Sequence, residues 1–171
     1  MNKIKTQLNL VYHRSKAVLM LFALMLLFAI YFTQRYSIAF NGSNSDCLKA
    51  TVFLIDKWDT NFTNEDIIAF VMNVENGLFE TGRTWVKKVA AMPGQQVSVS
   101  HDDVIVGEAR YALSTSYVLK MLERDFDSVV TSWTMSDEQV FMIGETLTSF
   151  DSRYWGPIQK SDVVGKAYAI F

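Results

Sequence analysis

The sequence predicts a mostly β fold: a domain of short, coiled strands with a small helical insertion, after one N-terminal transmembrane helix. An unbroken apolar run at residues 17–32 predicts the membrane helix, a series of short β-prone runs predicts the strands, and only one later segment has helical spacing. The chain has 171 residues, half of them hydrophobic, which is enough to bury a core. This composition excludes a disordered or low-complexity chain.

The apolar run, Ala17–Phe32, contains no charged residue, glycine or proline. Because it is apolar on every face, it does not fit a core helix with one solvent-exposed side. Its sixteen residues are slightly short for a membrane span, but the two polar residues that follow can extend it. Lys16 and Arg35 then reach the two membrane interfaces with their charged ends. We therefore expect a transmembrane anchor at residues 17–34.

Charge is distributed unevenly about this segment. The first sixteen residues hold four basic residues and no acidic one, whereas the rest of the chain holds 12 basic and 18 acidic residues. Because basic residues mark the cytoplasmic side of a membrane helix, we expect residues 1–16 to form a cytoplasmic tail and residues 35–171 a periplasmic domain. The protein is then a single-pass protein of a bacterial inner membrane. Its net charge of −2 argues against a nucleic-acid binder.

A cleaved secretory signal is the alternative interpretation of the same segment. Residues 37–39, Ser-Ile-Ala, resemble a small-x-small cleavage site. The apolar run, however, is longer than the usual core of a signal peptide, and the charged leader before it is long. These two features favour an uncleaved anchor.

The rest of the chain alternates short β-prone runs with turn residues. One segment, Ser116–Phe126, instead has apolar residues at helical spacing, with Ser114 or Thr115 available as its N-cap. The expected strands are 51–55, 66–72, 83–91, 97–99, 104–106, 139–143 and 163–170.

Two segments stand out because they hold both of the chain's prolines. The first, residues 85–94, has the sequence WVKKVAAMPG, and the second opens with Gly144-Glu145 and continues as SFDSRYWGP at residues 149–157. The single Cys excludes a disulfide scaffold and a multi-Cys metal cluster, and the two histidines lie on opposite sides of the apolar run. We therefore expect no metal and no organic cofactor.

These two segments resemble the membrane-bound type I signal peptidases, which are serine–lysine peptidases. Lys87 lies six residues before the Pro-Gly turn, as in the family, and residues 149–156 match the family's Ser-x-Asp-Ser-Arg-x-Trp-Gly box position by position. Residues 66–70 are similar to a family strand. The pilin-processing peptidases of conjugative plasmids and mobile elements look closest, since they share the single short anchor, the small size and the wording of the box. The resemblance implies a peptidase at the lipid bilayer that removes leader peptides from exported precursors, above all a conjugative pilin.

The resemblance also implies roles for particular residues. Lys87 is the expected general base, and strand alternation places it on the inner face. A lysine acts as a base only when neutral, and burial among apolar neighbours favours the neutral form. Ser149 is expected to hold Lys87 by a hydrogen bond. Asp151 and Arg153, with Ser152 between them, are expected to form the ion pair that orders this loop.

The match fails at the nucleophile. The family has a Ser followed closely by a Pro shortly after the membrane segment, and this chain has no Pro there. In one registration Ser45 attacks and Ser43 donates a hydrogen bond to the oxyanion. In the other, Cys47 attacks and Ser45 is the oxyanion donor. An unpaired thiol in an oxidising compartment, and the readier ionisation of a thiol than of a hydroxyl, favour Cys47.

Other functions stay open, and the missing Pro and Asp46 are the evidence for the first of them. Glu145 replaces the family's usual Asp, and Asp46 stands where relatives have an apolar residue. A non-catalytic single-pass component of a conjugation or secretion apparatus is one alternative, and a housekeeping signal peptidase is another. A third is a transpeptidase that joins pilin ends, since an amine can resolve an acyl-enzyme in place of water.

Overall fold

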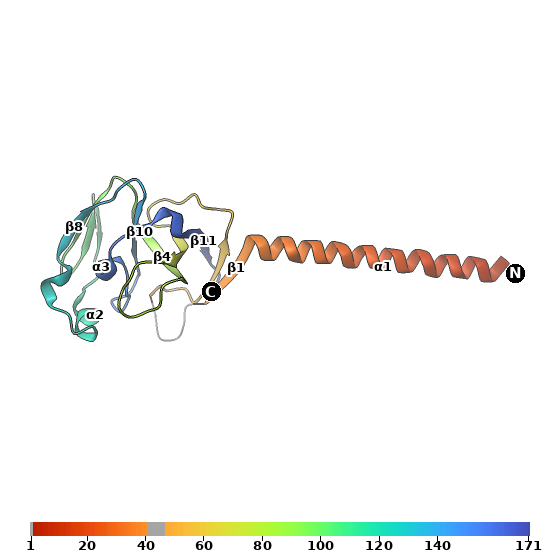
Figure 1. Ribbon diagram of the computed structural model, residues 1–171, viewed down its shortest axis with the longest axis horizontal. Helices are drawn as coiled ribbons and strands as arrows, with labels where there is room; N and C mark the ends of the chain where they lie inside the picture. Colours follow the sequence, from red (N-terminus) through yellow and green to blue (C-terminus); the bar gives the residue numbers. More distant parts are fainter. Residues whose placement is uncertain (1, 41–46) are drawn as a thin grey trace. The chain divides into compact units, whose positions relative to one another are not determined.

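The computed structural model describes residues 2–40 and 47–171, with side chains from residue 12 onward. The chain forms two compact units, residues 1–36 and residues 37–171 (Figure 1). The first unit consists almost entirely of one helix, and the second holds the folded β domain.

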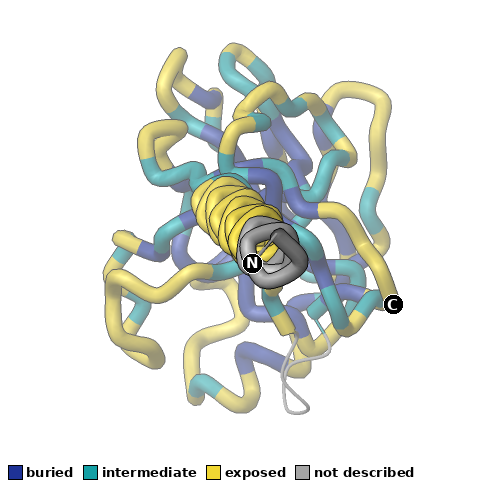
Figure 2. Tube along the Cα trace, turned by 90° about the vertical axis from the view of Figure 1, so that its right-hand side faces the viewer, coloured by how far each residue is buried: buried dark blue, intermediate teal, exposed yellow. Residues whose placement is uncertain are grey.

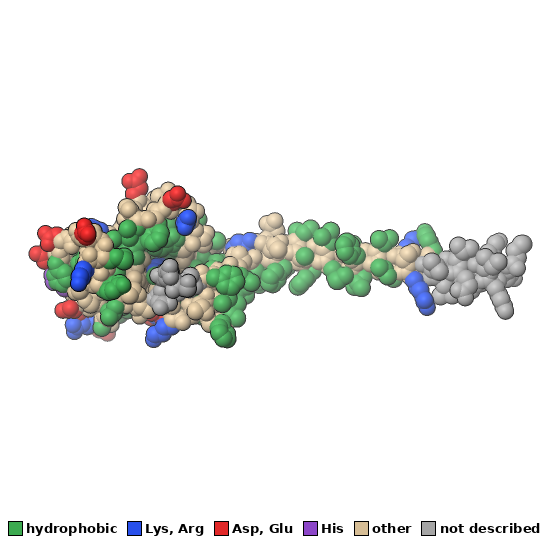
Figure 3. Space-filling model, turned by 90° about the horizontal axis from the view of Figure 1, so that it is seen from below, with side chains coloured by type: hydrophobic (Ala, Val, Ile, Leu, Met, Phe, Trp, Pro, Cys, Tyr) green, Lys and Arg blue, Asp and Glu red, His purple; other side chains and the backbone are tan. Residues whose placement is uncertain are grey.

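The helix, α1 (Asn2–Arg35), has 34 residues. From Tyr12 to Arg35 it is long and apolar enough, by length and composition, to cross a membrane, and hydrophobic side chains line it (Figure 3). The Thr33 hydroxyl donates to the Ala29 carbonyl at 3.0 Å, so the helix itself satisfies this polar group. The helix is longer than the predicted span because the N-terminal tail continues it. The division into tail, anchor and periplasmic domain stays a prediction.

The larger sheet has seven strands in the order β1-β2-β11-β3-β4-β9-β10. β4 pairs antiparallel with β3 over residues 83–88 and with β9 from residue 88 to residue 91. Residue 87 therefore lies just before the point at which β9 begins to cover β4. The strands are β1 (Tyr36–Phe40), β2 (Val52–Asp56), β3 (Ile67–Met72), β4 (Arg83–Ala91), β9 (Gln139–Ile143), β10 (Ile158–Gln159) and β11 (Val163–Ala169).

A smaller sheet has four strands in the order β7-β6-β5-β8, and it lies with α2 at one end of the β domain in Figure 1. Its strands are β5 (Gln96–Val99), β6 (Val104–Val106), β7 (Ala109–Tyr111) and β8 (Thr131–Thr134). The short helical elements are α2 (Ser116–Met121), η1 (Phe126–Val129), α3 (Ser152–Trp155) and η2 (Lys160–Asp162).

The prediction of a mostly β domain with a small helical part is confirmed. β4, β6 and β9 have the predicted bounds, and β2, β3, β5 and β11 differ from theirs by one residue at one or both ends. Four short strands, β1, β7, β8 and β10, have no counterpart among the predicted runs.

The predicted helix is wrong in its length. α2 ends at Met121, and Phe126 belongs to the separate 3-10 helix η1. Glu123 has a φ of 50°, a left-handed conformation that ends the helix. Thr115 is the N-cap residue, but its hydroxyl donates to the His101 carbonyl at 3.2 Å rather than to the helix.

β4 contributes to all three hydrophobic clusters of the β domain. Val89 belongs to the first cluster, Ala90 and Ala91 to the second, and Val86 packs against the third. In Figure 2 the dark blue, buried segments lie inside the domain, whereas residues 12–34 of α1 are exposed. Because three packed clusters fix β4, the side chains at its centre are held by a rigid element.

Candidate active site

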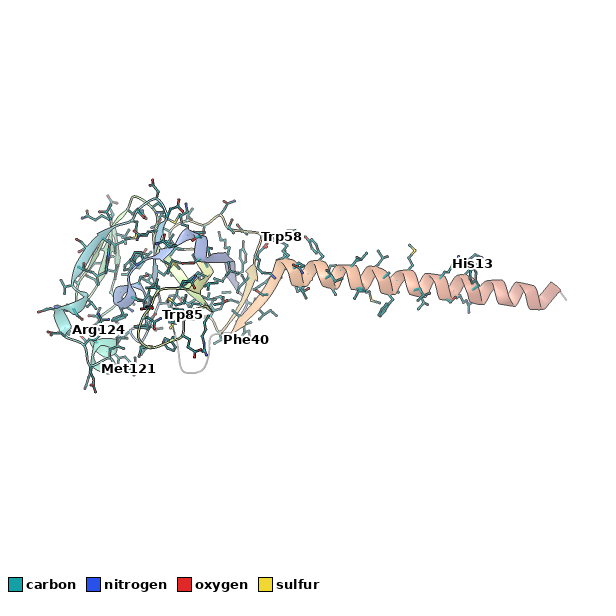
Figure 4. The ribbon with its side chains drawn as sticks, in the orientation of Figure 1. His13, Phe40, Trp58, Trp85, Met121 and Arg124 are labelled. Carbon is teal, nitrogen blue, oxygen red and sulfur yellow. The ribbon has the colours of Figure 1, made fainter. Side chains whose placement is uncertain are left out.

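Lys87 stands on the inner face of β4, where only 2% of its surface is exposed. Its Nζ donates a hydrogen bond of 3.0 Å to Ser149 Oγ. The same atom lies 5.7 Å from the centre of the Trp85 ring. Trp85, labelled in Figure 4, precedes Lys87 by two residues and so shares its face of the strand. The amine is thus enclosed by the fold, with a fixed hydroxyl as a partner.

The loop that carries Ser149 connects β9 to α3, and a buried ion pair holds it. Arg153 Nε and Nη2 donate to the two Asp151 oxygens at 2.7 and 2.9 Å, and both side chains are fully buried. Arg153 Nη2 also donates to the Ser149 carbonyl at 2.9 Å, and Nη1 to the Leu113 carbonyl at 3.0 Å. The guanidinium therefore ties the Ser149 loop to the chain next to β7.

Ser152 completes this support. Its Oγ accepts a hydrogen bond of 3.0 Å from the Met142 N–H, near the end of β9. Asp151 Oδ2 accepts another, of 2.8 Å, from the Gly144 N–H. Both ends of the loop are therefore held to β9 by the same short segment.

Neighbouring groups stabilise the charges of Asp151 and Arg153. Burial alone would raise the pKa of Asp151, but Arg153, Lys87 and the Gly144 N–H together hold that pKa below its ordinary value. Burial likewise opposes the charge of Arg153, yet Asp151 raises its pKa overall, with a smaller contribution from Cys47. The pair stays ionised at neutral pH, and the Cys47 thiol lies within electrostatic reach of it.

Gly144 is the point at which the Cys47 segment meets the Ser149 loop. A Cβ at this position would lie 2.0 Å from Ser149 Oγ and 2.6 Å from the Cys47 carbonyl oxygen. No side chain fits between them, so the glycine lets the two segments approach each other. The Cys47 carbonyl also accepts a hydrogen bond of 2.7 Å from the Glu145 N–H.

The structure describes Cys47 but not the other candidate nucleophiles. Cys47 is half-buried, its carbonyl lies against Gly144, and it has a free thiol. Ser43 and Ser45, the other candidates, lie outside the described residues, as does Asp46.

Sequence reasoning noticed Glu145 but gave it no role, and the structure places it at the centre of a polar bridge. Its Oε2 accepts a hydrogen bond of 3.0 Å from the Lys49 N–H, and its Oε1 forms an ion pair of 2.8 Å with Lys88. Lys88 also reaches Glu65 at 3.4 Å. Glu145 thus joins the chain just after Cys47 to the strand that carries Lys87. The only sequence signal was that Glu145 follows the required Gly144.

The contacts of Glu145 shift its own pKa and that of Lys88. Burial alone would raise the pKa of Glu145, but the Lys49 N–H and the Lys88 ammonium lower it overall. For Lys88, burial acts to lower the pKa, and Glu145 and Glu65 outweigh it, so that the pKa is raised. Both partners are charged at neutral pH.

The two histidines belong to different units of the chain. His13 lies on α1 (Figure 4), and His101 stacks on Phe126 with 3.9 Å between the ring centres. Among the described side chains, no group of three or more His, Cys, Asp or Glu residues is placed to hold a metal ion.

A family comparison decides the class of protein. The sequence profile described as "Signal peptidase, peptidase S26" matches residues 11–171. The chain belongs to this signal peptidase family. The resemblance noted in the Lys87 and Ser149–Gly156 segments is thereby confirmed at the level of the family, whereas the conjugative, pilin-processing branch stays a prediction.

Two individual proteins illustrate the relationship. A probable signal peptidase I-1 from Synechocystis sp. is 30% identical over 107 residues, which cover 60% of this chain and 50% of that protein. The chain thus matches this signal peptidase over half of the relative's length. A crystal structure of a signal peptidase I from Enterococcus faecalis V583 is similar with a TM-score of 0.41 and 21% identity, covering 62% of this chain and 96% of that one.

Proposed function

We propose that this signal peptidase family member is an active, membrane-anchored peptidase that removes leader peptides from exported precursors through an acyl-enzyme. One observation carries the proposal: a buried lysine amine is hydrogen-bonded to a fixed hydroxyl, and the Cys47 segment lies against the same loop. Burying a lysine amine costs free energy even when a hydrogen bond offsets part of its lost hydration. A catalytic base is a sufficient reason to keep one there.

The roles follow from the geometry. Lys87, as the free amine, takes the proton of the nucleophile while that atom adds to the scissile carbonyl carbon. The ammonium then gives a proton to the departing amine, and water attacks the acyl-enzyme with Lys87 again as the base. Ser149 orients the amine, and the Asp151–Arg153 pair, with Ser152, keeps Ser149 in place.

Cys47 is the nucleophile that we propose, with Ser45 donating to the oxyanion. The position of Cys47 beside Gly144 and its reach to Arg153 support this choice. The alternative is the ordinary serine assignment, with Ser45 as the nucleophile and Ser43 as the oxyanion donor. In either case Lys87 and Ser149 keep the same roles.

The leader peptide is expected to bind as an added strand. β4 pairs with β3 along one edge, and β9 covers its other edge only from Lys88 onward. In the part of the chain that the structure describes, the second edge of β4 is therefore open over residues 83–87. An extended peptide can pair with that edge and bring its scissile bond to Lys87.

Location and substrate complete the proposal. Residues 17–34 are the anchor in a bacterial inner membrane, with the basic N-terminal tail in the cytoplasm and residues 35–171 in the periplasm. The precursor that we propose first is a conjugative pilin, because the sequence of residues 149–156 resembles that of pilin-processing peptidases.

The test is cleavage of a co-expressed pilin precursor, and of a precursor with a generic Ala-x-Ala site, by the full chain in membranes. Lys87→Met keeps the buried volume but removes the amine, and it should lower the cleavage rate by at least about a hundredfold. Lys120→Met, on the exposed surface of α2, is the matched control and should leave the rate unchanged.

Two further variants choose the nucleophile. Loss of cleavage in Cys47→Ala, with substantial activity left in Ser45→Ala, supports the cysteine assignment. Loss only in Ser45→Ala restores the serine assignment. A wild-type chain that cleaves neither precursor would overturn the peptidase function and favour a non-catalytic membrane component.

A further inference from the structure

A hollow of about 250 Å³ is lined in part by Gly144 and Glu145, directly after β9. Its lining includes the buried, apolar Leu113 and Ile143 and the charged side chains of Lys88 and Glu145. Gly144 itself forms part of the wall, and Ser149 Oγ would lie 2.0 Å from any Cβ placed there. Gly144 therefore borders both the hollow and the Lys87–Ser149 pair.

The open edge of β4 and this hollow lie on opposite sides of Lys87 along the strand. Residues 83–87 offer the unpaired edge, and from residue 88 onward β9 occupies it, with Ile143 opposite Lys88. A peptide that pairs with the open edge must leave the sheet beyond Lys87, because β9 blocks its path. Ile143 and Gly144, at the end of β9, line the hollow, so the displaced peptide is directed into it.

The two halves of a substrate have different requirements. The acyl half stays covalently attached until water has attacked, so it needs the ordered backbone hydrogen bonds of a sheet edge. The amine half departs in the first step, so it needs only a shallow site from which it can leave. The open strand edge suits the first half and the hollow suits the second.

We infer that the hollow lined by Leu113, Ile143, Gly144, Lys88 and Glu145 binds the first residues of the released polypeptide, on the mature side of the scissile bond. The inference rests on the proposed peptidase function. Leu113 and Ile143 give the hollow an apolar part, while Lys49, Lys88 and Glu145 supply both signs of charge in its lining. Selection in the hollow is therefore by size rather than by charge.

Ala112 allows the hollow to be filled without disturbing the core. It is exposed and lines the hollow directly after β7, so Ala112→Trp adds a large ring there. Ala109 is also exposed, at the start of β7, and does not line the hollow. Ala109→Trp is therefore the matched control for the cost of an added surface tryptophan.

The experiment measures kcat/KM for precursors with an Ala-x-Ala site whose first mature residue is Ala, Glu, Lys or Phe. Ala112→Trp should lower kcat/KM for the Phe precursor by about tenfold more than for the Ala precursor. Glu and Lys should differ little from each other in the wild type. Ala109→Trp should leave all of these ratios at the wild-type values.

A second precursor series, varied at the last leader residue (Ala, Ser or Gly), separates the two halves. Ala112→Trp should leave these leader-side ratios unchanged. Equal losses for every mature residue, or a change confined to the leader series, would overturn the inference while the peptidase function stands. If the wild-type chain cleaves no precursor at all, the proposed function fails and the inference fails with it.

Discussion

Gly144→Ala is the sharpest perturbation that the site offers. The new Cβ would lie 2.0 Å from Ser149 Oγ, 2.4 Å from Ser149 Cβ and 2.6 Å from the Cys47 carbonyl oxygen. Favourable contacts of this kind are about 3.5 Å long, so one segment must move by about 1 Å or more. Overpacking of a closed site costs about 1–3 kcal/mol of unfolding free energy. A displacement of that size in a catalytic group can lower a rate by about a hundredfold.

The matched control is Gly107→Ala, in the turn between β6 and β7. Its Cβ meets nothing within 4 Å, but its φ is 58°. The control therefore carries only the backbone cost of a left-handed alanine, about 1 kcal/mol, and should leave cleavage at the wild-type rate.

Both variants can be measured in the full chain in detergent. All four tryptophans lie within residues 37–171, so their fluorescence reports urea unfolding of the β domain rather than of α1. Precursor cleavage in the same preparation gives the rate. A Gly144→Ala chain with wild-type cleavage and a wild-type urea midpoint would refute the close approach of Cys47 and Ser149 at this glycine.

Two other variants test the charges that support the site. Arg153→Met should lower the free energy of unfolding by about 3–5 kcal/mol, because it leaves the buried Asp151 carboxylate unpaired. Arg83→Met, which removes an exposed ion pair with Glu80, should cost about 1 kcal/mol or less, and equal costs of the two substitutions in urea unfolding would contradict this expectation. Glu145→Gln should reduce the loss of unfolding free energy that occurs as pH falls. Because folding lowers the pKa of Glu145, its contribution is full above the unfolded-state pKa and is lost as pH falls through the folded-state value. Urea midpoints measured from about pH 7 to about pH 2 check this, and parallel profiles for variant and wild type would count against it.

Parts of the fold that depend on local pattern could be predicted. The apolar run predicted the helix, and the β-prone runs at residues 83–91 and 139–143 predicted β4 and β9 with their bounds. The length of α2 could not be predicted in this way. Glu123 has no feature in the sequence that announces a left-handed backbone, and the spacing of apolar residues continues past it.

The candidate site was likewise predictable only where it depends on short, local sequence patterns. The box at residues 149–156 and the spacing from Lys87 to the Pro-Gly turn indicated the family, since both are short, local patterns. The role of Glu145 was missed because its partner, the Lys49 N–H, is 96 residues away and any residue type carries that donor. A backbone partner leaves no mark on the sequence.

The sequence by itself determined the apolar helix, the strand that carries Lys87 and membership of a peptidase family. Each of these rests on residues close together in the chain, whose spacing physical chemistry or resemblance can interpret. Only the tertiary structure decided that Lys87 meets Ser149 across 62 residues, that Gly144 brings Cys47 to the same loop, and that a hollow lies beyond it. The reason is that these contacts depend on which strands pair and in what register. The packing of the whole domain, rather than any single segment, fixes that pairing.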